Sequence, residues 1–307
     1  MQNGYEMGLL FFTIILLSIV LGYLTPYYAM IVGRYSFLAL AILLYASSTV
    51  IEWKKISIKT ISRKNIALAL FLGYVTFPLL QWILATSFIE DKEIIFGMVL
   101  TSLAPIAIVA PYFVNIQNGE KELSFFLVLT TTLLFPIYTP FLFHFLSFEK
   151  VGLFTRPIFI FSLLLFSVPT LLGLMTQIYS RKITEFFRKN WGIINLVFLS
   201  ILIYSIFGSA ANKVSTQISL SDKIGIVLVS AFQDIGVYAL SLFALPMLVT
   251  KKTTKTIAIT LCMKNVAATG VVLLLYWPNA AICSALVFCF HLFLFSYFHR
   301  PTKSARD

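Results

Sequence analysis

Lys264 is the residue whose type fits its surroundings least, because it lies in the middle of the apolar run 256–276. A charge at that depth in a lipid-solvated helix costs on the order of a few kcal/mol unless it is hydrated or paired. One interpretation is a structural ion pair or a misplaced helix boundary. The other is a role in binding a solute or a coupling ion, and the polar residues Asn265 and Thr260 in the same stretch favour this second interpretation.

Asp234 is the other charge inside an apolar run, and its run, 223–249, directly precedes that of Lys264. Charged residues at membrane depth commonly pair with one another. We therefore predict a Lys264–Asp234 pair. The sequence leaves open whether this pair is a fixed tie or a switch.

A polar turn begins at Asn115, and Ser124 and the threonine cluster 130–132 follow it. Ser and Thr side chains in membrane helices often bond to backbone carbonyls, so the cluster alone is more simply structural. Its position next to an interrupted run keeps Asn115 and Ser124 as candidate site residues.

Motifs for enzymatic chemistry are absent from the sequence, which has no G-x-S-x-G, no H-E-x-x-H and no phosphate loop. The cysteines lie in apolar runs without C-x-x-C spacing, so they predict neither a disulfide nor a zinc site. The three histidines, His144, His291 and His299, are isolated near run ends and are interpreted as interfacial residues. We predict no enzyme, no cofactor and no metal ion.

The elements that must position these residues are membrane helices. The 307 residues are 59% hydrophobic and only 11% charged, which excludes a water-soluble domain of this length. The net charge of +11 resides in short loops between apolar runs, so we predict a lipid bilayer and no nucleic acid as partner. A single membrane domain, 1–307, accounts for the whole chain.

Ten apolar runs are long enough to cross a bilayer as helices, and they predict an all-α membrane protein. They span about 7–25, 36–51, 66–88, 94–116, 123–147, 157–179, 191–211, 223–249, 256–276 and 279–298. Two sets of five helices enter the membrane from opposite faces because five is odd, so a 5+5 inverted repeat is expected. Pro105 and Pro111 interrupt the fourth run and the polar stretch 260–265 the ninth, which places both breaks beside a polar cavity.

The loop charges predict the orientation. Of the 23 Lys and Arg residues, 16 lie in loops on the side of the N-terminus, 6 lie on the other side, and Lys264 lies inside a helix. Positively charged loops stay in the cytoplasm, so both termini are expected there, in the cytoplasmic (inner) membrane.

Two stretches resemble the bile acid:sodium symporter family. Residues 105–140 start with P-I-A-I-V-A-P, contain G-E-K-E-L-S and end with T-T-T-L-L-F-P-I-Y-T-P, which resembles the family's P-x-G-x-x-S-N, G-x-x-x-L-S and S-T-L-L-x-P-x-x-T-P. Residues 255–265, K-T-I-A-I-T-L-C-M-K-N, are similar to the family's K-T-x-x-I-E-x-G-M-Q-N. The resemblance implies a panel-and-core fold with crossed, broken helices 4 and 9 and alternating access for an organic anion carried with sodium.

The positions that hold sodium in that family differ in this chain. The resemblance assigns the first sodium site to Ala110, Pro111, Ser124, Val128 and Thr260, and the second to Gly73, Thr260 and Lys264. The carboxylate is lost and an ammonium stands where an ion would bind, so family-type sodium coupling is not expected. A lysine there can supply the positive charge itself, and it can also load and release a proton.

We therefore expect a secondary transporter of a small organic anion, proton-coupled or uncoupled. The alternative is a non-transporting scaffold or sensor that keeps the transporter fold. A channel fits less well, because the sequence has no ring of charges and no filter-like loop. Transport measured in vesicles separates these hypotheses.

Overall fold

A computed structural model describes residues 2–51, 61–145, 156–214 and 218–298, and every element assigned in them is a helix. Each apolar run predicted from the sequence falls mainly on helix in these residues, the fourth and ninth runs being interrupted at 103–109 and 263–265; the end of the run 123–147 lies outside them. Five helices are long and apolar enough to span a membrane, or six if a pair bent by 108° at Thr25 counts as one span. The all-helical membrane fold is confirmed, whereas the count of ten spans stays a prediction.

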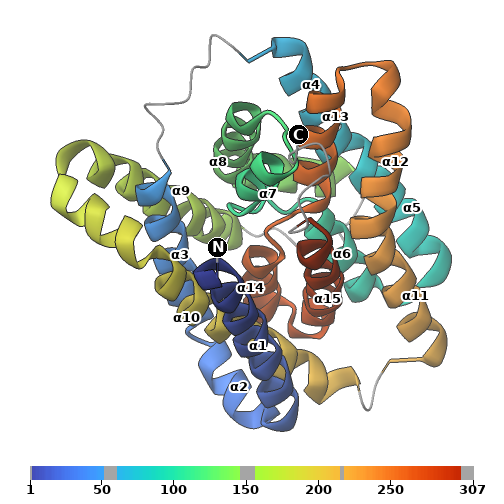
Figure 1. Ribbon diagram of the computed structural model, residues 1–307. Coiled ribbons are helices and arrows are strands. Elements are labelled where there is room, and N and C mark those ends of the chain that lie inside the picture. The colour runs from blue at the N-terminus through green and yellow to red at the C-terminus, as the bar shows by residue number, and fades with distance from the viewer. Residues whose placement is uncertain (1, 52–60, 146–155, 215–217, 299–307) are drawn as a thin grey trace. The chain divides into compact units, whose positions relative to one another are not determined.

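The described helices divide between two compact units, and each unit takes helices from both halves of the chain. The first unit contains α1 (Gln2–Leu24), α2 (Pro26–Gly33), α3 (Ser36–Val50), α9 (Arg156–Tyr179), α10 (Arg181–Val214), most of α14 (Val266–Tyr276), the turn Pro278–Ala280 and the start of α15 (Ala281–Phe298). Helix α2 was not among the predicted runs. Pro26 lies at the start of α2, where the amide hydrogen that proline lacks would have no partner within the helix. Proline is therefore tolerated there, and a new helix begins directly after the bend (Figure 1).

Glycines allow close helix packing in the first unit. A side chain on Gly22 of α1 would meet the Tyr204 carbonyl of α10 at 2.5 Å, and one on Gly173 of α9 would meet the Tyr45 carbonyl of α3 at 2.5 Å. Hydrogen bonds accompany these contacts, with Thr25 Oγ1 2.8 Å from Tyr204 Oη. Such small-residue contacts replace the hydrophobic driving force that lipid does not supply.

The second unit carries every residue singled out by the sequence. It contains α4 (Arg63–Phe71), α5 (Phe77–Phe88), α6 (Lys92–Ser102), α7 (Ala110–Ile116), α8 (Lys121–Phe145), α11 (Leu220–Ala231), α12 (Val237–Ala244), the turn Leu245–Met247, α13 (Lys251–Cys262) and the rest of α15. A π-helical turn, η3 (Leu72–Thr76), joins α4 to α5, and another, η5 (Phe232–Gly236), joins α11 to α12. The third and eighth predicted runs therefore share the same irregularity.

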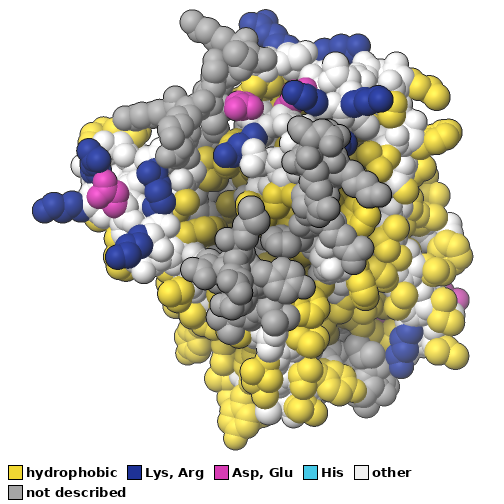
Figure 2. Space-filling view, in the orientation of Figure 1, with side chains coloured by type: hydrophobic (Ala, Val, Ile, Leu, Met, Phe, Trp, Pro, Cys, Tyr) yellow, Lys and Arg dark blue, Asp and Glu magenta, His cyan; other side chains and the backbone are white. Residues whose placement is uncertain are grey.

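The surface of the second unit separates by polarity. In Figure 2, Lys and Arg side chains gather over the ends of α4 and α13, and hydrophobic side chains cover α11 and α12. The exposed basic residues at those two helix ends are Arg63, Lys64, Lys251 and Lys252. All four belong to the predicted cytoplasmic side, and several others of that set, such as Lys54 and Arg300, lie outside the described residues. The orientation itself stays a prediction.

Candidate functional site

Two breaks in the helices face each other within the second unit. The chain between α6 and α7 and the chain between α13 and α14 run antiparallel and pair through their backbones. Ala107 N donates to Met263 O at 2.8 Å, and Asn265 N donates to Pro105 O at 2.6 Å. The predicted interruptions in helices 4 and 9 are therefore present and lie against each other. Each break supplies the other with backbone hydrogen-bond partners, which an unwound segment exposed to lipid would lack.

Side chains of neighbouring helices satisfy more of the backbone in the first break. These bonds are Ile106 N to Thr131 Oγ1 (3.1 Å), Tyr74 Oη to Ala104 O (3.3 Å) and Tyr138 Oη to Leu103 O (2.8 Å). The rings of Tyr74 and Tyr138 also contact each other, with centroids 4.7 Å apart. Within the threonine cluster, Thr131 thus holds the break, whereas Thr132 bonds to the Val128 carbonyl of its own helix. The first break is therefore an ordered, hydrogen-bonded segment and not a frayed helix end.

Lys264 lies in the second break with only 3% of its surface exposed. Its Nζ donates to Gly73 O at 3.1 Å and lies 3.9 Å from the centroid of the Tyr74 ring. A carbonyl oxygen and an aromatic face are both attractive to a cation. The ammonium is therefore held by two successive residues of η3, the carbonyl of Gly73 and the ring of Tyr74.

The π-helical turn η3 explains how Lys264 reaches this position. In η3, Phe77 N bonds to Leu72 O five residues earlier, which widens the turn; such turns are frequent at functional sites. A Cβ on Gly73 would lie 2.5 Å from Leu261 Cδ2 and 3.6 Å from Lys264 Nζ. Glycine at 73 thus lets α13 approach and leaves room beside the ammonium.

The predicted Lys264–Asp234 pair is wrong. Asp234, fully buried in η5, contacts His291 of α15, with Oδ2 2.7 Å from Nδ1. Lys264 instead points to η3. His291, interpreted from the sequence as interfacial, is buried, with 1% of its surface exposed. Adjacent runs in the sequence do not specify which faces of their helices meet, so the partner of Asp234 could not be read from order along the chain.

A buried amide cluster lies one residue before Asp234 and was missed by the sequence analysis. Gln81 Nε2 and Thr101 Oγ1 both donate to Gln233 Oε1, at 3.0 and 2.9 Å, and Gln233 Nε2 donates to Thr101 O at 3.2 Å. The cluster ties α5, α6 and η5 together. Two glutamines inside apolar runs were the signal that could have revealed it.

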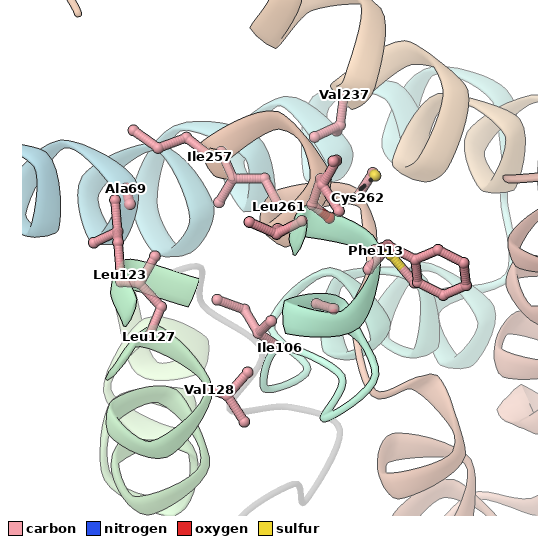
Figure 3. Close-up of a cluster of buried hydrophobic side chains, with 14 of the residues drawn as sticks. Ala69, Ile106, Phe113, Leu123, Leu127, Val128, Val237, Ile257, Leu261 and Cys262 are labelled. Carbon is pink, nitrogen blue, oxygen red and sulfur yellow. Dashed lines mark hydrogen bonds between the residues drawn. The ribbon is translucent and has the colours of Figure 1, made fainter. Parts of the chain in front are cut away.

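The positions assigned to the first sodium site do not form a set of oxygen ligands. Val128 packs in the apolar cluster around the breaks, with Ile106, Leu123 and Leu261 (Figure 3). Thr260 Oγ1 donates to two carbonyls of its own helix, Thr256 O and Ile257 O. The remaining positions are Ala110 and Pro111, buried at the start of α7, and Ser124, whose buried Oγ finds no partner among the described residues. Asn115, near the end of α7, is exposed, whereas these positions are buried.

Comparison with known proteins supplies the family. The chain matches the sodium bile acid symporter family over residues 37–217, which is more than half of its length and includes the first break. The match ends before Lys264. No curated protein matches the chain. With its apolar membrane helices, this integral membrane protein belongs to the sodium bile acid symporter family, a family of transporters.

Proposed function

We propose that this protein is a secondary transporter that moves a small organic anion across the cytoplasmic membrane by alternating access, without sodium coupling of the family type. The observation that carries the proposal is the position of Lys264 Nζ, on the Gly73 carbonyl and over the Tyr74 ring. In this family's pattern, Gly73 and Lys264 take the positions of sodium ligands.

A fixed ammonium can replace a bound sodium ion because both carry one positive charge and both are attracted to carbonyl oxygens. The family's carboxylate is replaced by Thr260, whose hydroxyl bonds to its own helix. A free sodium ion would therefore meet an ammonium and no compensating carboxylate. The positive charge that balances an anion then belongs to the protein itself.

Paired irregularities support alternating access. The third and eighth runs each contain a π-helical turn, and the fourth and ninth each contain a break. Corresponding irregularities in two halves are expected of an inverted repeat, in which the halves exchange conformations to open either side. Broken helices near the midplane are where such transporters bind their solutes.

The test uses the purified full chain and a library of monovalent carboxylates and sulfonates that includes taurocholate, p-aminohippurate, pyruvate and gluconate. We expect at least one of them to raise the melting temperature equally in sodium and potassium salts, and to enter proteoliposomes under both conditions. A shift that needs sodium would contradict the replacement of the ion by Lys264. Neither a shift nor uptake for any member would contradict anion transport and favour the scaffold.

A further inference from the structure

We infer that the Asp234–His291 pair is a proton-binding site, and that this site couples one proton to each monovalent anion. The inference rests on the proposed function and names its coupling ion. The carboxylate and the imidazole contact each other at 2.7 Å, in the interior of the second unit, and neither is the hydrogen-bond partner of the Lys264 ammonium, which is Gly73 O.

The pair has open positions for protons. Within the described residues, Asp234 Oδ1 and His291 Nε2 find no hydrogen-bond partner, although both atoms are buried. His291 Nδ1 is shared between Asp234 Oδ2 and the Val287 carbonyl of its own helix, at 2.7 and 3.1 Å. Buried polar atoms without partners are rare and need an explanation. A site that gains and loses a proton supplies one.

In this proposal Lys264 stays protonated throughout, and the thiol that faces the pair does not compete for the proton near neutral pH. The elements packed against η5 are α5, α11, α12 and α13. From these, the ionisable group that faces the pair is the Cys262 thiol of α13, which also lies near Lys264. An ordinary thiol loses its proton only at about pH 8.5. Asp222, another buried carboxylate, lies in the first turn of α11 and accepts from Glu90 N.

The pair adjoins the break that carries the fixed ammonium. The Lys264 carbonyl faces the His291 ring, although Nε2 completes no hydrogen bond with it. A change of charge on the pair therefore changes the electrostatic potential at the break. The proton and the anion that we assign to Lys264 need not touch each other to be coupled.

Charge balance gives the stoichiometry. With a neutral imidazole, Lys264 and Asp234 carry +1 and −1, and their sum is zero. One proton on the pair raises the sum to +1, and one monovalent anion returns it to zero. The empty and the fully loaded states are thus neutral, whereas the proton alone or the anion alone leaves a net charge at membrane depth, which is costly. The neutral states are the ones that can change conformation, so the protein carries proton and anion together, without net charge.

Asp234→Asn separates this role from a structural one, because a neutral asparagine imitates the protonated pair beside the fixed charge of Lys264. In the wild type, the Kd of the library anion with the largest thermal shift should fall about tenfold for each unit that the pH falls, while the pair is unprotonated. Binding should take up one proton per protein, measured with a pH dye in weakly buffered solution. In Asp234→Asn the affinity should be high at every pH, with no proton uptake. Glu122→Gln, an exposed carboxylate on α8, is the matched control and should behave as wild type.

A wild-type Kd that is constant with pH, or weaker anion binding by Asp234→Asn at every pH, would overturn the proton site. If Asp234→Asn does not fold, the neutral double variant Asp234→Asn/His291→Gln replaces it. Failure of the wild type to bind any anion would refute the proposed function instead. The ¹⁵N spectrum of His291, assigned with His291→Gln, then decides separately, because a signal unchanged from about pH 5 to about pH 9 would exclude proton exchange at the pair.

Discussion

Lys264 supplies a positive charge and also holds that charge in place. In an ion-coupled carrier, the bound ion supplies the charge and separate ligands hold it. The ammonium is attached to the chain next to Met263 and Asn265, whose backbones pair with the other break. Its position is therefore fixed by the same hydrogen bonds that stabilise the unwound segments. A bound sodium ion would have to be recruited from solution, whereas this charge is always present while the lysine is protonated.

Removing the charge of Lys264 should weaken anion binding. We expect Lys264→Gln to raise the Kd of the selected anion roughly 10- to 100-fold, because one charge in a partly desolvated site contributes on the order of 2 kcal/mol. Lys264→Arg should restore little, since a planar guanidinium does not fit the compact space between Gly73 O and the Tyr74 ring. Isothermal titration measures both. The control is Lys252→Gln, an exposed lysine of α13, the helix that precedes the break. Unchanged affinity in Lys264→Gln would remove Lys264 from the site.

A side chain at position 73 should destabilise the second unit. Gly73→Ala places a Cβ 2.5 Å from Leu261 Cδ2, and overpacking of this kind costs about 1–3 kcal/mol. Thermal unfolding in detergent measures the loss. Gly192→Ala in α10 is the matched control, because a Cβ there meets nothing within 4 Å. Equal melting temperatures for the two variants would show that the contact between η3 and α13 is looser than described.

At the scale of elements, the breaks depend on side chains from other helices. Thr131→Val keeps the shape of the side chain but leaves Ile106 N without its acceptor, which costs about 1–3 kcal/mol for a buried donor. Thr132→Val, which loses only a bond to its own helix, is the control and should cost less. Chemical denaturation in mixed micelles compares the two. If both lose the same stability, the hydroxyl of Thr131 does not support the break.

The sequence predicted the elements better than their contacts. Apolar runs located the helices, and Pro105 and the polar stretch at Lys264 located the breaks, because both signals are local. The π-helical turns η3 and η5 were not predicted, since no residue pattern distinguishes them from regular helix. The partner of Asp234 was missed for another reason, because the rotation of each helix about its axis is set by packing. The Lys264–Gly73 contact joins residues 191 positions apart. No local pattern encodes it, and only the family resemblance assigned both residues to one site.

At the scale of the whole molecule, the charge distribution predicts the topology. The basic residues favour cytoplasmic termini, with the loop at Glu90 on the opposite side. In a cysteine-free background, an impermeant maleimide should label Glu90→Cys from outside the cell. It should label Asp307→Cys, which lies outside the described residues, only after the membrane is permeabilised. Labelling of Asp307→Cys in intact cells would contradict a cytoplasmic C-terminus.

The π-helical turn η3 has a consequence for insertions and deletions. Each residue turns a helix by about 100°, so loss of one residue between Arg63 and Phe77 would rotate α4 against α5 and carry one helix's buried face toward lipid. Hydropathy and composition would hardly change, yet the Gly73 carbonyl would no longer face the ammonium. Among related chains, the number of residues in this segment should therefore vary less than their identity.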